Sequence, residues 1–96
     1  MIIKLRPIRW DADLSVVKLG DALDINGEVF DFSQLLEGQA LPFGAVDSEF
    51  VVGDVTRQEG QLVIPLLAPH GAGSSEAARF PADITDPPDG PVELPR

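Results

Sequence analysis

The sequence predicts a mainly β fold: a small barrel or roll of four to six bent antiparallel strands, with one short helix and a proline-rich C-terminal arm. Apolar and polar residues alternate with period two along most of the chain, as in half-buried strands. Asn-Gly at 26–27 and Glu-Gly at 59–60 each separate two such runs, as hairpin turns do. Nine glycines and nine prolines favour bends, and a bent sheet that curls into a barrel removes its exposed edges.

The first strand is expected to begin near the N-terminus and to be interrupted at Pro7. Ile3 and Leu5 share one parity before the proline, whereas Ile8 and Trp10 form the apolar set after it. Proline has no N–H for the ladder, so Pro7 indicates an edge position or a bulge.

The next segment, 14–25, has four large apolar residues on one parity, with Lys18 and Asp24 on the other. Gly20 either bends one long strand or, with Asp21, forms a turn between two short ones. The continuous parity favours the bend. The residues of this expected inner face are Val17, Leu19, Leu23 and Ile25.

The first hairpin follows directly, because both Asn26 and Gly27 tolerate the positive φ of a type I′ turn. This turn pairs Ile25 with Glu28 and Leu23 with Phe30, and opposed residues share a face. The expected inner set is Leu23, Ile25, Phe30 and Phe32. Asp24 and Asp31 then face outward.

Residues 31–38, "DFSQLLEG", break the alternation and predict the short helix. Asp31 with Gln34 forms a possible capping box, with Ser33 as the alternative cap. Gly38 supplies the C-terminal stop.

The second hairpin is expected in residues 48–69, with Glu59 and Gly60 at its turn; a three-residue loop with a glycine bulge is the alternative. Gly53 leaves room on the inner face and Arg57 lies at its mouth. Pro65 marks an edge or a bulge. The inner face comprises Val51, Val55, Leu62, Ile64 and Leu66.

The chain is expected to contain a single β domain, 1–80, and an acidic arm, 81–96. Residues 69–79 are small and polar and predict a loop. Residues 80–96 hold five of the nine prolines, so this segment either lies extended over the domain or hangs free. Partial docking is favoured by Phe80, Ile84, Val92 and Leu94.

The formal net charge of −9 disfavours binding to phosphate backbones. Lys4, Arg6 and Arg9 precede the first acid and could bind nucleic acid with Trp10 or a phenylalanine as a stacking platform. The favoured alternative is an edge strand whose cations discourage aggregation and pair with neighbouring carboxylates.

No catalytic or cofactor site is predicted. His70 is the only histidine, and Ser48, Ser74 and Ser75 are candidate partners, but there is no G-x-S-x-G elbow. The absence of cysteine removes thiolate metal sites, and "DADL" and "DITDPPDG" match calcium loops only loosely. We therefore expect a protein that is not an enzyme and holds no metal or cofactor.

Neither a signal-peptide core nor a membrane span is expected, because the longest apolar run, "LVIPLLAP", is far shorter than the ~20 residues of a membrane helix. The predicted location is the cytoplasm, with association with a virion as a further possibility.

Four segments in this order, "RPIRWD", "INGEVFDFSQLLEG", "FVVGDVTRQEGQLVIPLLAPHG" and "RFPADITDPPDGPVELP", resemble a family of short proteins encoded in tailed phages and prophages. The resemblance implies a gene in a phage module near the tail genes, with no known cofactor or active site. The predicted succession of bent strands also resembles, in shape, the small barrels of Sm/Lsm-type proteins, which form rings; their RNA-binding loop motifs are missing here.

The first functional hypothesis is a non-enzymatic assembly or interaction module that pairs through an edge strand with itself or with a phage tail partner. The alternative is a nucleic-acid-related barrel. In that case its N-terminal cations bind RNA, or its Asp-rich face imitates a phosphate backbone. The candidate interaction residues are Lys4, Arg6, Arg9, Trp10, Asp24 and Asp31.

Overall fold

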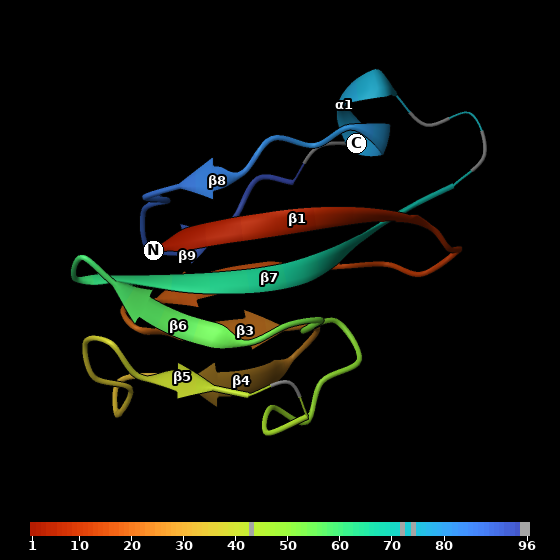
Figure 1. The fold of residues 1–96 in the computed structure, drawn as a ribbon. Coiled ribbons are helices and arrows are strands. Elements are labelled where there is room, and N and C mark those ends of the chain that lie inside the picture. Colours follow the sequence, from red (N-terminus) through yellow and green to blue (C-terminus); the bar gives the residue numbers. More distant parts are fainter. Residues whose placement is uncertain (43, 72, 74, 95–96) are drawn as a thin grey trace.

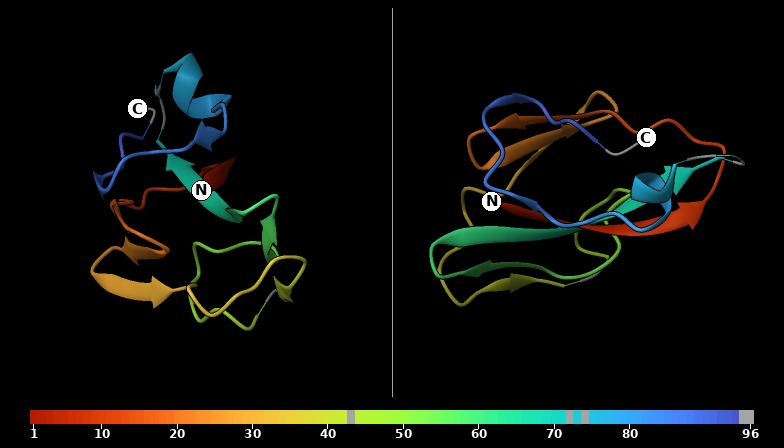
Figure 2. Two further views of the ribbon diagram at one scale, coloured as in Figure 1. Left: turned by 90° about the vertical axis from the view of Figure 1, so that its left-hand side faces the viewer. Right: turned by 90° about the horizontal axis from the view of Figure 1, so that it is seen from above.

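The protein consists of two β-sheets packed face to face (Figures 1 and 2), as seen in a computed structural model that describes residues 1–42, 44–71, 73 and 75–94. The five-stranded sheet has the order β5-β6-β7-β1-β8 and the four-stranded sheet has the order β4-β3-β2-β9. The mainly β prediction is confirmed, with two open sheets in place of a closed barrel.

The strands of the five-stranded sheet are β1 (Ile2–Arg9), β5 (Ala40–Leu41), β6 (Val55–Gln58), β7 (Gln61–His70) and β8 (Ile84–Thr85). Those of the four-stranded sheet are β2 (Val16–Leu19), β3 (Ala22–Ile25), β4 (Glu28–Asp31) and β9 (Gly90–Pro91). The single helix of the described residues is α1 (Glu76–Arg79), which packs against β1 and β7.

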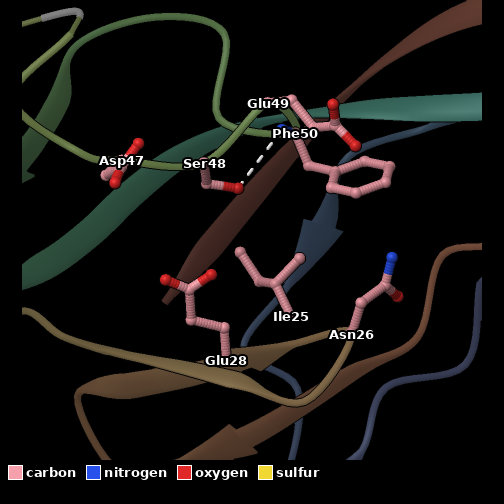
Figure 3. A pocket seen from close by; sticks show the side chains of 7 residues that line it. All are labelled: Ile25, Asn26, Glu28, Asp47, Ser48, Glu49 and Phe50. Carbon is pink, nitrogen blue, oxygen red and sulfur yellow. Dashed lines mark hydrogen bonds between the residues drawn. The ribbon is translucent and has the colours of Figure 1, made fainter.

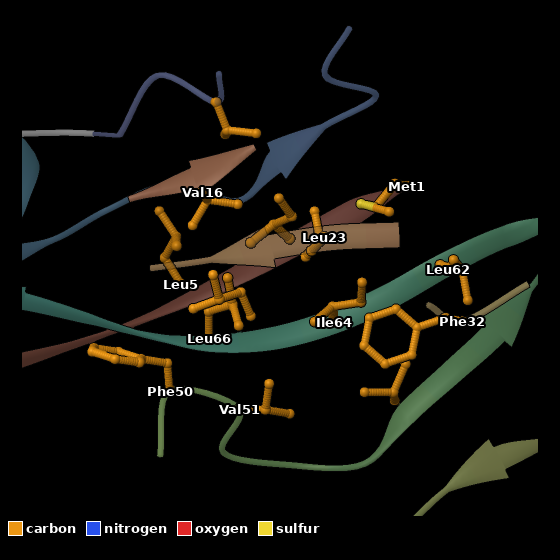
Figure 4. Close-up of a cluster of buried hydrophobic side chains, with 14 of the residues drawn as sticks. Met1, Leu5, Val16, Leu23, Phe32, Phe50, Val51, Leu62, Ile64 and Leu66 are labelled. Carbon is orange, nitrogen blue, oxygen red and sulfur yellow. The ribbon is translucent and has the colours of Figure 1, made fainter. Parts of the chain in front are cut away.

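The core fills the space between the two sheets (Figure 4). No polar or charged side chain is buried in it, within the described residues. Each large aliphatic side chain removed from water contributes about 1.5–3 kcal/mol to folding, so this layer holds the sheets together. The side chains with the least exposure are Ile3, Val16, Leu23, Val55, Leu62, Ile64 and Leu66.

The centre of the five-stranded sheet is a parallel pair, β1 with β7, in which Ile3 lies opposite Ile64 and Leu5 opposite Leu66. The other strand pairs of the described residues are antiparallel. The prediction of antiparallel strands throughout is therefore wrong for β1 and β7. Alternation has the same period in both arrangements, so it carries no information on direction for two strands so far apart in the chain.

Pro7 does not change the parity of β1, contrary to prediction. Ile8 lies on the outer face and is 40% exposed, while Trp10, beyond the strand, packs against the core. The Trp10 N–H donates to the His70 carbonyl, so even-numbered residues of β1 direct their backbone groups to β7. The backbone nitrogen of Pro7 therefore points to the side of β1 on which β8 lies. β8 pairs with β1 at Ile2 and Ile3, so Pro7 lies beyond this pairing on an edge, as one interpretation predicted.

Gly20 and Asp21 form a turn between β2 and β3, not the favoured bend. Gly20 has a φ of +62°, and Leu19 lies opposite Ala22. A two-residue turn places its flanking residues on the same face, so Leu19 shares a face with Ala22 and not with Leu23. Val17 and Leu19 consequently face outward, and Val16, 2% exposed, takes the inner position.

Both predicted hairpins are confirmed. Asn26 and Gly27 have φ values of +52° and +90°, and Glu59 and Gly60 have values of +51° and +79°, as type I′ turns require. The predicted pairs of the first hairpin are present, and Phe30, at its inner face, is half-buried. All five residues predicted for the inner face of the second hairpin are buried, namely Val51, Val55, Leu62, Ile64 and Leu66.

Pro65 lies in the central strand β7, opposite a bulge in the neighbouring segment. Of the two predicted explanations for this proline, an edge or a bulge, the bulge is the one observed. Thr56 pairs with Val63 and Val51 with Leu66, so the strand opposite β7 holds two extra residues around Gly53. The Val52 N–H donates to the Pro65 carbonyl at 3.1 Å, which places the missing N–H of Pro65 on the bulged side. A Cβ at Gly53 would lie 3.0 Å from Pro65 Cγ, so glycine permits the close approach.

The predicted helix at 31–38 is absent, and the helix forms at α1 instead. The Asp31 carboxylate accepts from the Ser33 N–H, and the Leu35 N–H donates to the Phe32 carbonyl, so this segment is a series of tight turns. In α1, by contrast, the Ser75 hydroxyl accepts from the Ala78 N–H at 3.2 Å, as an N-cap does. The predicted loop at 69–79 is therefore partly strand and helix.

The C-terminal arm, described to residue 94, docks on both sheets. β8 pairs with β1 and β9 pairs with β2, so the arm crosses from one layer to the other (Figure 2). Val92 is buried, and Ile84 and Leu94 pack against the core. Phe80, also predicted to dock, is 76% exposed. Residues 95–96 of the predicted arm lie outside the described residues.

Candidate functional site

The outer face of the four-stranded sheet combines exposed aliphatic side chains with two carboxylates; we call it the acidic face. Leu19 and Val29 are 51% and 56% exposed. Asp24 and Asp31, both predicted to face outward, lie here. Within the described strands no basic residue has this orientation. By register, the outward residues of this sheet are Val17, Leu19, Ala22, Asp24, Val29, Asp31 and Pro91.

The two carboxylates of the acidic face are held by nearby backbone amides. Asp24 Oδ1 accepts from the Gly27 N–H at 2.7 Å, and Asp31 Oδ1 accepts from the Ser33 N–H at 2.9 Å. The hydrogen bond from the Ser33 backbone lowers the pKa of Asp31, because it favours the charged form. Asp31 is therefore ionised at neutral pH.

One edge of this sheet is β4, and its outer side has no pairing strand in the part of the chain that the structure describes. The Phe32 N–H donates to the Asp21 carbonyl at 3.0 Å, so residues of that parity direct their backbone groups toward β3. Val29 and Asp31 alternate with them and direct their N–H and C=O groups outward. β4 thus offers an open hydrogen-bonding edge.

The outer face of the five-stranded sheet carries cations; we call it the basic face. Lys4 and Arg6 are exposed there. A Cβ at Gly53 would lie 3.7 Å from Arg6 Nη2, which places this guanidinium over the bulge. None of the outward strand positions described is acidic. Their residues on β1 and β7 are Ile2, Lys4, Arg6, Ile8, Gln61, Val63, Pro65, Leu67 and Pro69.

Arg9 and Trp10 do not join the basic face. Arg9 has the inward parity of β1, and the Trp10 ring stacks on Phe50 with centroids 5.5 Å apart. The predicted combination of three cations with an aromatic platform is therefore divided between different sides of the molecule. Nor do Lys4 and Arg6 make an ion pair with a described carboxylate, as the alternative interpretation expected.

A cleft of about 410 Å³ lies between the β3–β4 turn and residues 47–50 (Figure 3). Its polar lining is mostly acidic, from Glu28, Asp47 and Glu49, and Phe50 closes one side. The Ser48 hydroxyl accepts from the Phe50 N–H at 3.2 Å, and no histidine, lysine or arginine is among the described lining residues. This cleft was not predicted, because its acids come from separate loops.

The two described candidate serines lie in different parts of the fold. Ser48 lines the cleft, whereas Ser75 caps α1 and Ser74 lies outside the described residues. His70, predicted in an exposed loop, is the half-buried last residue of β7. Among described residues, no group of three or more possible metal ligands is present. Asp89, in one loosely calcium-like segment, instead accepts from Lys18 Nζ at 2.8 Å.

Comparisons with protein-family models, curated proteins and solved structures give no match for this chain. None of the helices described is of a length and apolarity that would let it cross a membrane.

Proposed function

We propose that this chain is a non-enzymatic assembly module that associates by adding the β4 edge to a strand of another protein chain. The open edge of β4 carries this proposal. The strand, Glu28–Asp31, contains neither proline nor lysine, the two residue types most characteristic of a protected edge, and its charged residues are Glu28 and Asp31. Two consecutive outward pairs of backbone groups, at Val29 and Asp31, provide the hydrogen bonds of strand addition.

The simplest partner for β4 is β4 of a second copy. Antiparallel pairing about a two-fold axis at Phe30 would place Val29 of each copy opposite Asp31 of the other. The half-buried Phe30 rings would then lie beside each other across the new junction, while like charges would not stand directly opposite. The resemblance to short phage proteins supports a setting of this kind, in which small proteins assemble beside a tail.

Val29→Pro tests the edge. Proline removes the outward N–H but leaves the β3–β4 ladder intact, because Val29 does not donate to β3. We expect the wild-type chain to form an edge-paired dimer with rising concentration in sedimentation velocity, and Val29→Pro to lose this dimer. Val29→Thr, which keeps the N–H and the branched shape, is the matched control and should dimerise.

Asp31→Pro removes the second outward N–H and serves if Val29→Pro does not fold, as judged by circular dichroism. A wild-type chain that stays monomeric and captures no partner strand would contradict the proposal. So would a folded Val29→Pro variant that dimerises as strongly as the wild type.

A further inference from the structure

We infer that copies of this chain also stack through their outer sheet faces, with the basic face of one copy against the acidic face of the next. The partner is a second copy of this chain. This contact is separate from the β4 edge, since it uses side chains on two opposite outer surfaces and not the backbone of one strand.

The separation of charge between the two faces is the first argument. Among the described outward strand positions, the basic face holds Lys4 and Arg6 without an acid, and the acidic face holds Asp24 and Asp31 without a base. The whole chain has sixteen acids and seven bases, so outward strand positions that hold cations and no acid depart from its composition. Complementary potentials of this kind fix the orientation of an interface.

The availability of these charges is the second argument. The two ion pairs within the described residues join Lys18 to Asp89 and Arg57 to Asp21. Neither pair uses a charge from the outward strand positions of the two faces. The cations of the basic face therefore keep their donors for an external carboxylate.

Exposed aliphatic side chains on both faces are the third argument. Ile8 on the basic face is 40% exposed, and Leu19 and Val29 on the acidic face are 51% and 56% exposed. Sheets stack about 10 Å apart when such side chains interdigitate. Burying them would also exclude water from the charge pairs and strengthen these pairs.

The contact is heterologous, because the two faces differ. Each copy keeps one unused face after its first contact, so addition continues into a ring or an open stack. Two basic faces or two acidic faces would repel each other. The net charge of −9 opposes every contact between copies, and salt weakens this repulsion together with the attraction. Salt dependence alone would not identify the contact.

Charge reversal with rescue tests the stacking directly. One variant, Lys4→Glu/Arg6→Glu, makes both faces acidic, and another, Asp24→Lys/Asp31→Lys, makes both faces basic. Each variant alone should associate about tenfold or more weakly than the wild type in sedimentation velocity. An equal mixture should recover the association, because every acidic face then meets a basic one.

Both variants still have a net negative charge, so attraction between oppositely charged whole molecules would not explain the recovery. The recovery would therefore be specific to the faces. Arg9→Glu/Arg79→Glu makes the same change of charge away from the basic face and should associate like the wild type. The stacking is refuted if Lys4→Glu/Arg6→Glu associates like the wild type, or if the mixture associates no better than its separate components.

The two contacts give distinguishable failures. Loss of association in Val29→Pro, with no effect of charge reversal, would support the edge and refute the stacking. Loss on charge reversal with recovery in the mixture, but no effect of Val29→Pro, would support the stacking and contradict the edge.

Discussion

Arg57 donates from Nε to the backbone carbonyl oxygen of Leu35 at 2.5 Å. Arg57 lies in β6 of the five-stranded sheet and Leu35 lies in the segment after β4, so this hydrogen bond connects β6 to the chain that leaves the four-stranded sheet. Arg57 Nη2 also lies 3.2 Å from Asp21 Oδ2 and 3.5 Å from the Phe32 carbonyl. The planar guanidinium presents several donors in fixed directions. One side chain, only 15% exposed, thereby joins the two layers at their open side.

Replacement of Arg57 should weaken this junction. Arg57→Met leaves the Leu35 carbonyl without its donor, and we expect a loss of about 2–4 kcal/mol in the free energy of unfolding. Arg57→Lys keeps one donor and should lose about 1–2 kcal/mol. Urea unfolding followed by circular dichroism measures both, with Arg79→Met on α1 as an exposed control. A change below about 0.5 kcal/mol in Arg57→Met would contradict the bridging role.

Asn26 should stabilise the loop before β2 as well as the turn after β3. Its Oδ1 accepts from the Ser15 N–H at 2.6 Å and its Nδ2 donates to the Asp13 carbonyl at 2.9 Å. Asn26→Gly permits the positive φ but loses both bonds, and we expect a loss of about 1–2 kcal/mol. Asn26→Asp keeps the acceptor and should lose less.

Amide exchange of Ser15 checks this assignment separately from stability. The Ser15 N–H should exchange slowly in the wild type and in Asn26→Asp, and faster in Asn26→Gly. Equal protection in all three proteins would show that the side chain of Asn26 does not hold this loop.

The local parts of the fold could be predicted because short-range rules determine them. Asn26 and Gly27 specify a type I′ turn, and this turn sets the register that places Phe32 in the core. The error at Leu19 arose where two rules compete, since Gly20 suits a bend as well as a turn. The parallel pairing of β1 with β7 could not be predicted, because it depends on a long crossover and not on neighbouring residues.

The candidate surfaces were predicted only in part for the same reason. The outward orientation of Asp24 and Asp31 follows from the hairpin register, and that of Lys4 and Arg6 from the alternation in β1. The cleft beside Glu28 brings together loops that are distant in sequence, so no local pattern indicated it. Trp10 belongs to the predicted apolar set after Pro7 and was a stacking platform only in the nucleic-acid alternative; its ring packs against Phe50, where an apolar surface is more stable.

Gly53→Ala should destabilise the protein through one contact. The new Cβ would lie 3.0 Å from Pro65 Cγ, and the proline, in the central strand β7, has little freedom to move. We expect a loss of about 1 kcal/mol or more in the free energy of unfolding. The double-mutant cycle with Pro65→Ala measures the coupling, which should reduce the cost of Gly53→Ala. Strictly additive losses would show that the contact is relieved elsewhere.

The Lys18–Asp89 contact should make the docking of the C-terminal arm sensitive to acid. The hydrogen bond from Lys18 is the main cause that lowers the pKa of Asp89, followed by the hydrogen bond from the Gly20 N–H and the charge of Lys18. A carboxyl whose pKa is lower in the folded state stabilises the fold above its unfolded pKa of about 3.9. That contribution is lost as the pH falls through the lower folded value.

Asp89→Asn should therefore reduce the loss of stability on acidification below about pH 5. The urea midpoint, measured from neutral to acid pH, should fall less steeply in this variant than in the wild type. Asp83→Asn, an exposed substitution on the same arm, should leave the slope unchanged. Parallel curves for the wild type and Asp89→Asn would mean that removing the charge of Asp89 removes no proton-linked stability. The carboxylate would then not contribute to the docking of β9.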